Sequence, residues 1–421
     1  MKKLLFVIIA AIAFVACEKE PFAQANDYVE RVSSNKVSLS KALFYAENSI
    51  NGIGTSTRST TRKVKSTEIF VAKPSTRSAE SEEVSFYLIN YEDNEGFAMV
   101  STDSRTTPVY AYSDEGNLNP ADFENNPGLK IFLEGAILNY EDEIANCSTY
   151  ALGDGDRYPI IEFPEELMAI NDIVELVEID RVYYFKGIRV NENIKGPFVP
   201  VQWHQHLPYG QYFSNQKAGC GPVAAAQVMA YYQYPSNYGT YTFYWTQMLS
   251  LPSPIDEISQ IYDVRYISSL LYSIGERANV DDSGANTIVS TSNLVAAIRD
   301  FGYNCQYMSS YNSDVIKNNI SANKPIIISG NCDSEEYGHI WVIDGYNITN
   351  YTNTLYYITY PYNIYDASST DPITYYHCNW GWSPGQDSGQ HYYLRNGYFH
   401  SNSFRYNDYI EIVHNIQPQT N

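Results

Sequence analysis

Cys220 is the residue whose neighbours point most directly to chemistry in this chain of 421 residues. It is followed by Gly221, Pro222 and an alanine-rich run that ends at Tyr231. Proline is favoured in the first turn of a helix and alanine has the highest helix propensity, so we expect a helix to begin here. A thiol at a helix N-terminus is stabilised as the thiolate by the helix dipole and the free N–H groups. The pattern predicts a cysteine nucleophile, and the alternative is a small core residue packed beside Gly and Ala.

A nucleophilic cysteine needs a base, and His339 is the candidate. It follows Gly338 and heads the apolar segment 340–343, an unusual place for one of only seven histidines. We expect it to take the thiol proton and to return it to a leaving amine. Asn379 is expected to accept a hydrogen bond from the imidazole, with Trp380 as an apolar lid over that bond. The alternatives are a structural His at a strand end and a turn with core tryptophans.

Acyl transfer also requires donors for the oxyanion. Gln205 lies shortly before Cys220 and can donate a side-chain N–H, with the backbone N–H of Cys220 as the second donor. The alternative is a surface glutamine. His204 and His206 suggest a metal pair, but no further His or acidic residue clusters near them in the sequence, so we expect no metal there. No organic cofactor is implied.

The elements that must position these residues indicate an α+β domain, because helices come first and strands follow. Pro235 is expected to end the helix that starts at Cys220. The expected helices cover 220–231, 258–276 and 293–301, and the expected strands cover 325–329, 340–343, 374–377 and 391–394.

The first half of the chain predicts a second, smaller α+β module over 83–145. It is expected to contain a hairpin, a third strand and a helix, and a short helix is expected before it. Residues 51–78 have little apolar periodicity and are interpreted as loop or linker, and the acidic, proline-containing residues 150–200 as a linker. The expected segments are a helix at 38–50, strands at 84–90, 96–101 and 108–112, and a helix at 127–145.

Charge and composition exclude several classes of protein. The net charge is −21, which disfavours binding to nucleic acid or anionic lipid. The mean hydropathy of −0.34 disfavours a polytopic membrane protein, and six cysteines without a CxxC pair disfavour both a disulfide scaffold and a zinc finger. Residues 1–200 hold 50 charged residues and 11 Tyr, whereas 201–421 hold 25 and 29. This contrast predicts two different kinds of domain.

The first seventeen residues have the layout of an export signal, with a basic start, an apolar run over 4–15 and then Ala16 and Cys17. Twelve apolar residues are too few to span a bilayer. The position of Cys17 resembles a bacterial lipoprotein signal, in which that Cys is lipidated; the alternative is an ordinary cleaved signal. Both predict a protein outside the cytoplasm, and the first predicts a lipid anchor on the outer membrane or cell surface.

Four motifs in the second half resemble, in type and order, the streptopain family of papain-like cysteine peptidases. Segments within 87–116, among them Tyr87-x-x-Asn90 and Gly96-Phe97, resemble the inhibitory propeptide of that family. The four motifs are Trp203-x-Gln205, Gly219-Cys220 with its helix, Gly338-His339 to Gly345, and Asn379-Trp380-Gly381-Trp382.

The resemblance implies a secreted zymogen with endopeptidase activity on proteins or peptides, inhibited intramolecularly by its own pro-domain. It also implies the roles given above for Cys220, His339, Gln205, Asn379 and Trp380. Ser283 and Gly338 would line the substrate cleft, with a preference for a bulky apolar residue two positions before the cut bond. The resulting plan is a signal at 1–17, a helix and flexible linker at 18–82, a pro-domain at 83–150, an acidic linker with the processing site at 151–195, and a papain-like catalytic domain at 196–421.

Three features depart from the family pattern. Gly221-Pro222-Val223 stands where Val-Ala-Thr is usual, and Gly210 stands where Asn usually follows Pro-Tyr. Residues 347–374 form a Tyr/Asn/Thr-rich insertion between His339 and Asn379. The Gly-Cys-Gly-Pro string also resembles double-glycine leader peptidases of the same clan. The other alternative is a catalytically silent inhibitor or binding homologue. We expect no nucleic-acid partner, and membrane contact only through the lipid anchor.

Overall fold

The computed structural model describes a large part of the chain, and these residues belong to one compact unit, Lys36–Asn421. The predicted export signal and Cys17 lie outside the described residues. No helix among the described residues has both the length and the apolar character that a membrane span requires. The described ranges are 36–51, 62–73, 83–103, 105–149, 173–179, 182–188, 193–255, 258–331, 338–359, 363–382, 391–395 and 410–419.

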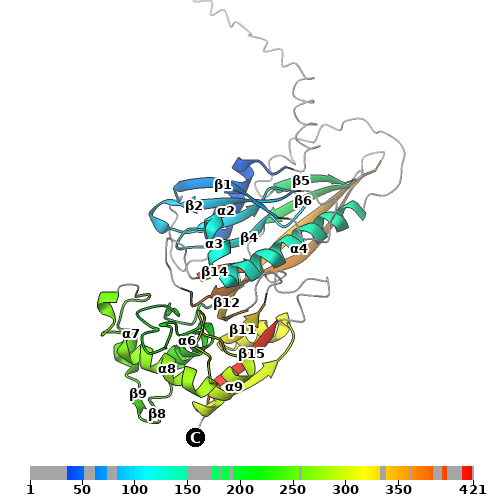
Figure 1. Ribbon diagram of the computed structural model, residues 1–421. Helices are drawn as coiled ribbons and strands as arrows, with labels where there is room; N and C mark the ends of the chain where they lie inside the picture. Colours follow the sequence, from blue (N-terminus) through cyan, green and yellow to red (C-terminus); the bar gives the residue numbers. More distant parts are fainter. Residues whose placement is uncertain are drawn as a thin grey trace, which may run out of the picture. The chain divides into compact units, whose positions relative to one another are not determined.

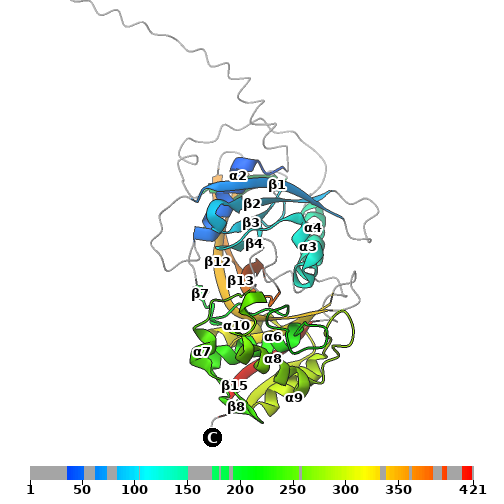
Figure 2. The same cartoon turned by 60° about the vertical axis from the view of Figure 1, so that its left-hand side comes forward.

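The N-terminal domain is a four-stranded antiparallel sheet with helices on both faces (Figure 2). Phe86 and Leu88 pack in the cluster that contains helix α4, whereas Ile89 and Tyr91 pack in the cluster that contains α2. Because side chains alternate across a strand, a sheet covered on both faces buries nearly every residue of its central strands. The elements are α2 (Leu39–Asn51), β1 (Val64–Ala72), β2 (Val84–Tyr91), η1 (Glu92–Asn94), β3 (Phe97–Ser101), β4 (Val109–Ser113), α3 (Pro120–Asn125) and α4 (Pro127–Thr149).

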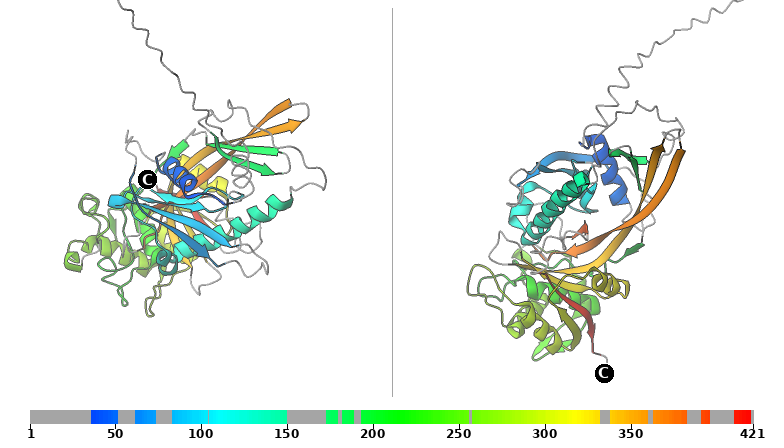
Figure 3. Two further views of the ribbon diagram at one scale, coloured as in Figure 1. Left: turned by 90° about the horizontal axis from the view of Figure 1, so that it is seen from above. Right: turned by 90° about the vertical axis from the view of Figure 1, so that its right-hand side faces the viewer.

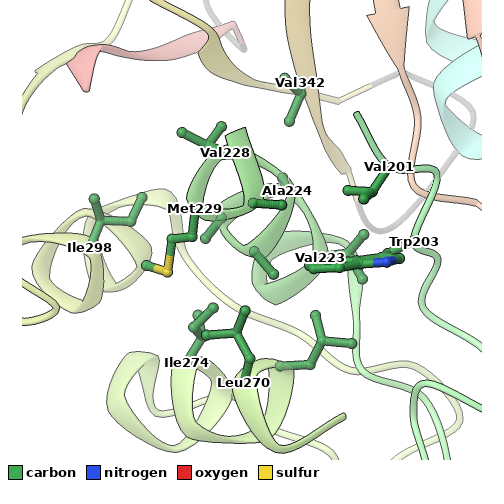
Figure 4. Close-up of a cluster of buried hydrophobic side chains, with 14 of the residues drawn as sticks. Val201, Trp203, Val223, Ala224, Val228, Met229, Leu270, Ile274, Ile298 and Val342 are labelled. Carbon is green, nitrogen blue, oxygen red and sulfur yellow. The ribbon is translucent and has the colours of Figure 1, made fainter. Parts of the chain in front are cut away.

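The C-terminal domain is built around helix α6 (Cys220–Tyr232), which is buried along most of its length. Figure 4 shows Val223, Val228 and Met229 of this helix among side chains from the surrounding elements. A helix that is apolar on all sides belongs in the interior, which explains the alanine-rich sequence. The helices around it are α7 (Trp245–Leu249), η2 (Ile258–Gln260), α8 (Arg265–Ala278), α9 (Thr291–Asp300) and α10 (Ser313–Ser321).

Among the described residues, thirteen strands form one sheet that runs through both domains (Figure 1). Strand β4 of the N-terminal domain pairs with β14, so the two domains share backbone hydrogen bonds. The long strands β12 and β13 extend from the C-terminal domain along the N-terminal one (Figure 3). The C-terminal strands of this sheet are β10 (Tyr303–Met308), β11 (Ile326–Gly330), β12 (His339–Thr359), β13 (Asn363–Asn379), β14 (His391–Arg395) and β15 (Glu411–Pro418); β8 (Asn237–Tyr238) and β9 (Tyr241–Thr242) pair separately.

The structure confirms the α+β class and the main expected elements. Helices form at 39–51, 127–149, 220–232 and 291–300, each within a few residues of its predicted bounds. The predicted hairpin and the third strand of the N-terminal domain are also present. The prediction for 258–276 was partly wrong, because η2 and α8 are separate helices there.

Two segments interpreted as linker contain strands, so those interpretations were wrong. Residues 64–72 form β1, which pairs with β2 but leaves most of its side chains exposed. Residues 150–200 contain β5 (Ile173–Ile179), β6 (Val182–Ile188) and β7 (Asn193–Lys195), of which β6 and β7 pair with β12. The insertion 347–374 supplies the extended part of β12 and β13. β1 and β7 leave most of their side chains exposed, so their sequences lack the apolar alternation that would have indicated a strand.

Candidate active site

Cys220 is the first residue of α6, as the sequence predicted. The residue before it, Gly219, has a φ of 81°, a conformation that residues with a side chain rarely adopt. A Cβ on Gly219 would also lie 2.9 Å from the Cβ of Thr287. The tight turn before the helix therefore requires glycine, and it places the thiol at the positive end of the helix dipole.

Backbone N–H groups, including those of Ile340 and Gly221, lie near the thiol of Cys220 and favour its thiolate. Burial raises the pKa of the Cys220 thiol above its ordinary value, and these N–H groups oppose that rise. The side chain still keeps part of its surface accessible. In this arrangement Cys220 is a neutral thiol at neutral pH.

Gln205 lies in a segment tied to both sides of the site. Its backbone N–H donates to the Gly381 carbonyl at 3.2 Å, and its own carbonyl accepts from the Ala218 N–H at 2.7 Å. These bonds join the residues just before Cys220 to the loop that follows Asn379. The side chain of Gln205 is buried, and its role as an oxyanion donor stays a prediction.

His339 begins strand β12 and is buried among three tryptophans. Its ring lies 6.0 Å from that of Trp341, 6.1 Å from that of Trp380 and 5.7 Å from that of Trp382. Its Nε2 contacts the carbonyl oxygen of Trp380 at 2.9 Å. Burial lowers the pKa of His339 to about 4, and the Trp380 carbonyl opposes that change. The imidazole is therefore neutral at neutral pH.

Cys220 and His339, both among the described residues, share no hydrogen bond in this structure. Gly128 of the N-terminal domain, in the first turn of α4, packs beside Trp380 and His339. A Cβ on Gly128 would lie 2.2 Å from Cε3 of Trp380 and 3.0 Å from Cδ2 of His339. The start of α4 thus fills the space beside the imidazole so closely that only glycine fits.

The sequence places α4 there through its cap. Pro127 is the first helical residue, and Asn126 Oδ1 accepts from the N–H groups of Gly128 and Leu129 at 2.9 and 3.2 Å. Asn as a cap and Pro at the first position are a preferred helix start. The packing role of Gly128 was not predicted from the sequence. Asn126-Pro127-Gly128 is nevertheless a typical helix start, and it was the only local sign of this turn.

Asn379 ends β13 but does not contact His339 by a hydrogen bond in this structure. Its Nδ2 donates to the Val201 carbonyl at 3.0 Å, and its Oδ1 accepts from Gln227 Nε2 at 2.9 Å and from the Gly381 N–H at 3.3 Å. The predicted pairing of Asn379 with His339 and the lid role of Trp380 stay predictions. Gln227 was missed, although a Gln in an alanine-rich helix was a visible exception.

A second polar pair was also missed, between Asp344 and His377. Asp344 Oδ1 lies 2.5 Å from His377 Nδ1, and both side chains are buried. Asp344 Oδ2 accepts from the N–H groups of Phe198 and Val199 at 3.0 and 2.7 Å. Asp344 follows His339 on β12 at a bulge, and His377 precedes Asn379 on β13. The pair therefore ties Phe198 and Val199, near the start of the C-terminal domain, to strands β12 and β13. These two strands carry His339 and Asn379.

His204 and His206 do not form a metal pair in this arrangement. His204 Nε2 donates to the Ile255 carbonyl at 3.1 Å, and its Nδ1 accepts from the His206 N–H at 3.3 Å. Both ring nitrogens of His204 are thus used by the protein. Burial lowers the pKa of His206 to about 4.

Ser283 lies in a loop that contacts the turn before Cys220. Its N–H and Oγ both donate to Asp281 Oδ1, at 3.0 and 2.6 Å. In the same loop, the carbonyl of Ala285 accepts from Lys217 Nζ at 2.9 Å. The predicted contact of Ser283 with substrate is untested, but its loop borders the nucleophile's segment.

Gly338, the other predicted substrate contact, is crowded by its own domain. A Cβ there would lie 1.8 Å from Asn331 Oδ1 and 2.4 Å from the Gly330 carbonyl oxygen. Asn331 leaves no room for a side chain at Gly338, so glycine is required there whether or not a substrate binds. Its contact with substrate stays a prediction.

Comparisons with known proteins match two regions of the chain to two protein families. Residues 203–393 match the profile described as Peptidase C10 family, and residues 25–139 match the profile described as Spi protease inhibitor. The chain is 24% identical over 353 residues to thiol protease/hemagglutinin PrtT of Porphyromonas gingivalis, covering 75% of this chain and 34% of that protein. It is 24% identical over 326 residues to streptopain of Streptococcus pyogenes, covering 69% of this chain and 70% of that protein.

The chain thus spans about a third of the length of PrtT. Among solved structures, a fragment of prointerpain A from Prevotella intermedia aligns with a TM-score of 0.48 and 15% identity, covering 84% of this chain and 100% of that fragment. The two profiles fall on the two domains described above, with Cys220 and His339 inside the peptidase match. The chain therefore carries a peptidase C10 domain with an inhibitor-like propeptide domain ahead of it, and its thiol protease relatives support a cysteine peptidase.

Proposed function

We propose that this chain is the zymogen of an exported cysteine endopeptidase that hydrolyses peptide bonds with Cys220 and His339. The observation that carries the proposal is the N-terminus of α6, where Cys220 follows a turn that only glycine can make. The Gln205 backbone, bonded to both Ala218 and Gly381, brings the candidate oxyanion donor to the same place. A reactive cysteine is expected in such a setting, because helix N–H groups stabilise the thiolate.

In the proposed reaction His339 takes the proton of the Cys220 thiol, and the thiolate attacks the carbonyl carbon of the substrate. The Gln205 side chain and the Cys220 N–H hold the resulting oxyanion. His339 then protonates the amine as the C–N bond breaks, which leaves a thioester on Cys220. A water molecule, deprotonated by His339, cleaves the thioester and releases the acid. Asn379 and Trp380 keep the imidazole oriented.

The arrangement of the full chain supports an inactive precursor. Cys220 and His339 are both neutral here, and the imidazole contacts the Trp380 carbonyl rather than the thiol. Because Gly128 of α4 packs against Trp380 and His339, we propose that the propeptide domain holds the imidazole away from Cys220. Release of α4 would let His339 approach the thiol and form the thiolate–imidazolium pair.

Contacts between the two domains support intramolecular inhibition. Asn347 Nδ2 donates to the Tyr112 hydroxyl at 2.9 Å, and the Tyr375 hydroxyl donates to the Val109 carbonyl at 3.2 Å, with all four residues buried. These hydrogen bonds lie beside the shared β4–β14 pairing. We propose that cleavage between the domains, and then loss of these contacts, accompanies activation.

For location, we propose export with lipidation at Cys17, which would anchor the protein outside the cytoplasm. The support is the sequence pattern of residues 1–17 alone. For substrates, we propose proteins or peptides with an apolar residue two positions before the cut bond, bound beside Ser283 and Gly338. The support is the position of the Ser283 loop next to the segment that leads to Cys220.

An active-site-directed, thiol-reactive peptidyl probe tests the proposal. The processed protein should cleave casein and take up one equivalent of probe at Cys220, whereas the unprocessed chain should react far more slowly. Cys220→Ala should abolish labelling and lower cleavage by about 10⁴-fold or more. Cys305→Ala, at another free cysteine, is the matched control and should keep both properties. Cleavage of casein by Cys220→Ala at the wild-type rate would overturn the mechanism.

A further inference from the structure

Gln227 is a fully buried amide on the helix that carries Cys220. It lies seven residues after Cys220, which corresponds to about two helical turns, or roughly 10 Å along the axis. Its Nε2 donates to the Trp203 carbonyl at 2.8 Å and to Asn379 Oδ1 at 2.9 Å. One side chain therefore joins the nucleophile's helix to the residue proposed to orient the base.

The hydrogen bonds around Asn379 determine which way its amide points. The Val201 carbonyl can only accept, so it takes the Nδ2 group of Asn379. The N–H groups of Gln227 and Gly381 can only donate, so they take Oδ1. An amide turned by 180° would set its oxygen against the Val201 carbonyl and its nitrogen against two donors. Asn379 is thus held in a single orientation.

Gln227 is itself held in one orientation. Both groups that its Nε2 meets, the Trp203 carbonyl and Asn379 Oδ1, are acceptors. A reversed Gln227 would place its oxygen against both of them. Removal of the Nε2 donor would leave the Asn379 amide held only by the Val201 carbonyl and the more distant Gly381 N–H, although no contact with substrate or thiol is lost.

Core packing alone does not account for a glutamine here. The neighbours of Gln227 on α6 are Ala226 and Val228, and the helix is apolar on all sides. Within the described residues, Gln227 Oε1 is buried and has no hydrogen-bond partner. A buried acceptor without a partner is unfavourable, and an apolar side chain of similar length would avoid that cost. Gln227 supplies an N–H donor to Trp203 and Asn379, and an apolar residue could not supply it.

We infer that Gln227 is a positioning residue that holds the amide of Asn379 in one place and orientation, so that Asn379 can orient His339 during peptide-bond hydrolysis. The inference rests on the proposed function. Asn379 directly precedes Trp380 in the chain. In the precursor, His339 Nε2 contacts the carbonyl oxygen of Trp380. When His339 turns towards Cys220, its Nε2 leaves the Trp380 carbonyl and takes the side-chain oxygen of Asn379 as its acceptor. Gln227 therefore affects the rate of the chemical steps and not the binding of substrate.

A double-mutant cycle with Asn379 tests this inference in the processed enzyme. Gln227→Met keeps the length of the side chain and removes the donor, and we expect kcat to fall about 10-fold with KM unchanged, the scale typical of groups that orient a catalytic ligand. In the Asn379→Ala background the same substitution should change kcat by less than about 2-fold, because the amide that it orients is gone. Alkylation of Cys220 at pH 6 should slow in parallel, since less thiolate–imidazolium pair forms.

Gln211→Met is the matched control. Gln211 also makes several side-chain hydrogen bonds, to the Pro208 and Ile261 carbonyls and to Ser268 Oγ, and it is remote from Asn379 in this network. It should lose stability comparably but keep kcat. If Gln227→Met fails to fold, Gln227→Glu, with the same number of atoms, takes its place in the cycle. An equal fall in kcat in both backgrounds, or an effect on KM alone, overturns the inference. A wild-type protein that neither cleaves casein nor labels at Cys220 overturns the proposed function instead.

Discussion

The segment around Cys220 and the segment around His339 are held in place by different parts of the chain. Cys220 depends on its neighbours: Gly219 makes the turn, α6 follows at once, and Ala218 bonds to Gln205. His339 is packed by residues from distant segments, among them Trp380 and Gly128. The candidate nucleophile is held in place within the C-terminal domain, whereas the candidate base also packs against a residue of the propeptide domain.

This difference suggests which half regulates activity. The candidate nucleophile can be preformed in the precursor without harm, because the thiolate and not the neutral thiol is the reactive form. The imidazole needs freedom to approach it, and the start of α4 occupies the space beside its ring. A propeptide domain that controls the base therefore needs no contact with the cysteine. Substitutions in the Cys220 segment or in the His339 segment can test this difference one segment at a time. Each is made in a Cys220→Ala background, in which we expect no self-processing.

The largest effect is expected at the buried carboxylate on the base side. Asp344→Ala removes the acceptor of the Val199 N–H and the partner of His377, and we expect it to lower the free energy of unfolding by about 3–5 kcal/mol. Asp282→Ala, on the nucleophile side, removes an exposed carboxylate that accepts from the Ser214 N–H, and should cost about 1 kcal/mol or less. Denaturant titration of the two variants measures both. Equal losses would contradict the contrast.

The second effect is a loss of stability at acid pH that comes from His339. Its folded-state pKa of about 4 lies below the ordinary value of 6.5, so the unfolded chain binds the proton more readily. Stability from this group is therefore full above pH 6.5 and falls as the pH drops towards 4, by roughly 3 kcal/mol in total. His339→Gln should remove that part of the pH dependence. His206, whose pKa is also lowered to about 4, contributes in the same direction and remains in both proteins.

The free energy of unfolding is measured at pH 7 and at pH 4 for the Cys220→Ala parent and for its His339→Gln variant. The difference between pH 7 and pH 4 should be smaller in His339→Gln. An unchanged difference would mean that His339 is accessible to protons in the precursor, and that the base side is not closed by α4.

The smallest effect is expected from a single methyl group at the domain contact. Gly128→Ala places a Cβ 2.2 Å from Trp380, so α4 must shift, at a cost of about 1–3 kcal/mol. We expect a lower melting temperature and faster cleavage of the precursor by an added protease. Gly284→Ala, where a Cβ meets only the Asn286 carbonyl oxygen at 4.0 Å, is the matched control and should behave as the parent. A melting temperature unchanged by Gly128→Ala would show that the close packing against Trp380 is absent in solution.

Much of the architecture could be predicted from the sequence. The helix at Cys220, the buried strands of the propeptide domain and the strand headed by His339 all follow from runs of apolar residues and from Pro and Gly at their ends. The strands β1 and β7, each paired with a single strand, could not be predicted in this way. Most β1 side chains are exposed, so the segment lacks the alternation that marks a half-buried strand.

The types of the candidate site residues and their order along the chain were determined by the sequence alone. The tertiary structure decided how they pair. His339 contacts the Trp380 carbonyl rather than Cys220, and Gly128 closes the space beside it. Gln227 reaches Asn379 across 152 positions of the chain. A sequence pattern reports the periodicity and caps of one segment, whereas a hydrogen bond between distant segments depends on how the whole core packs.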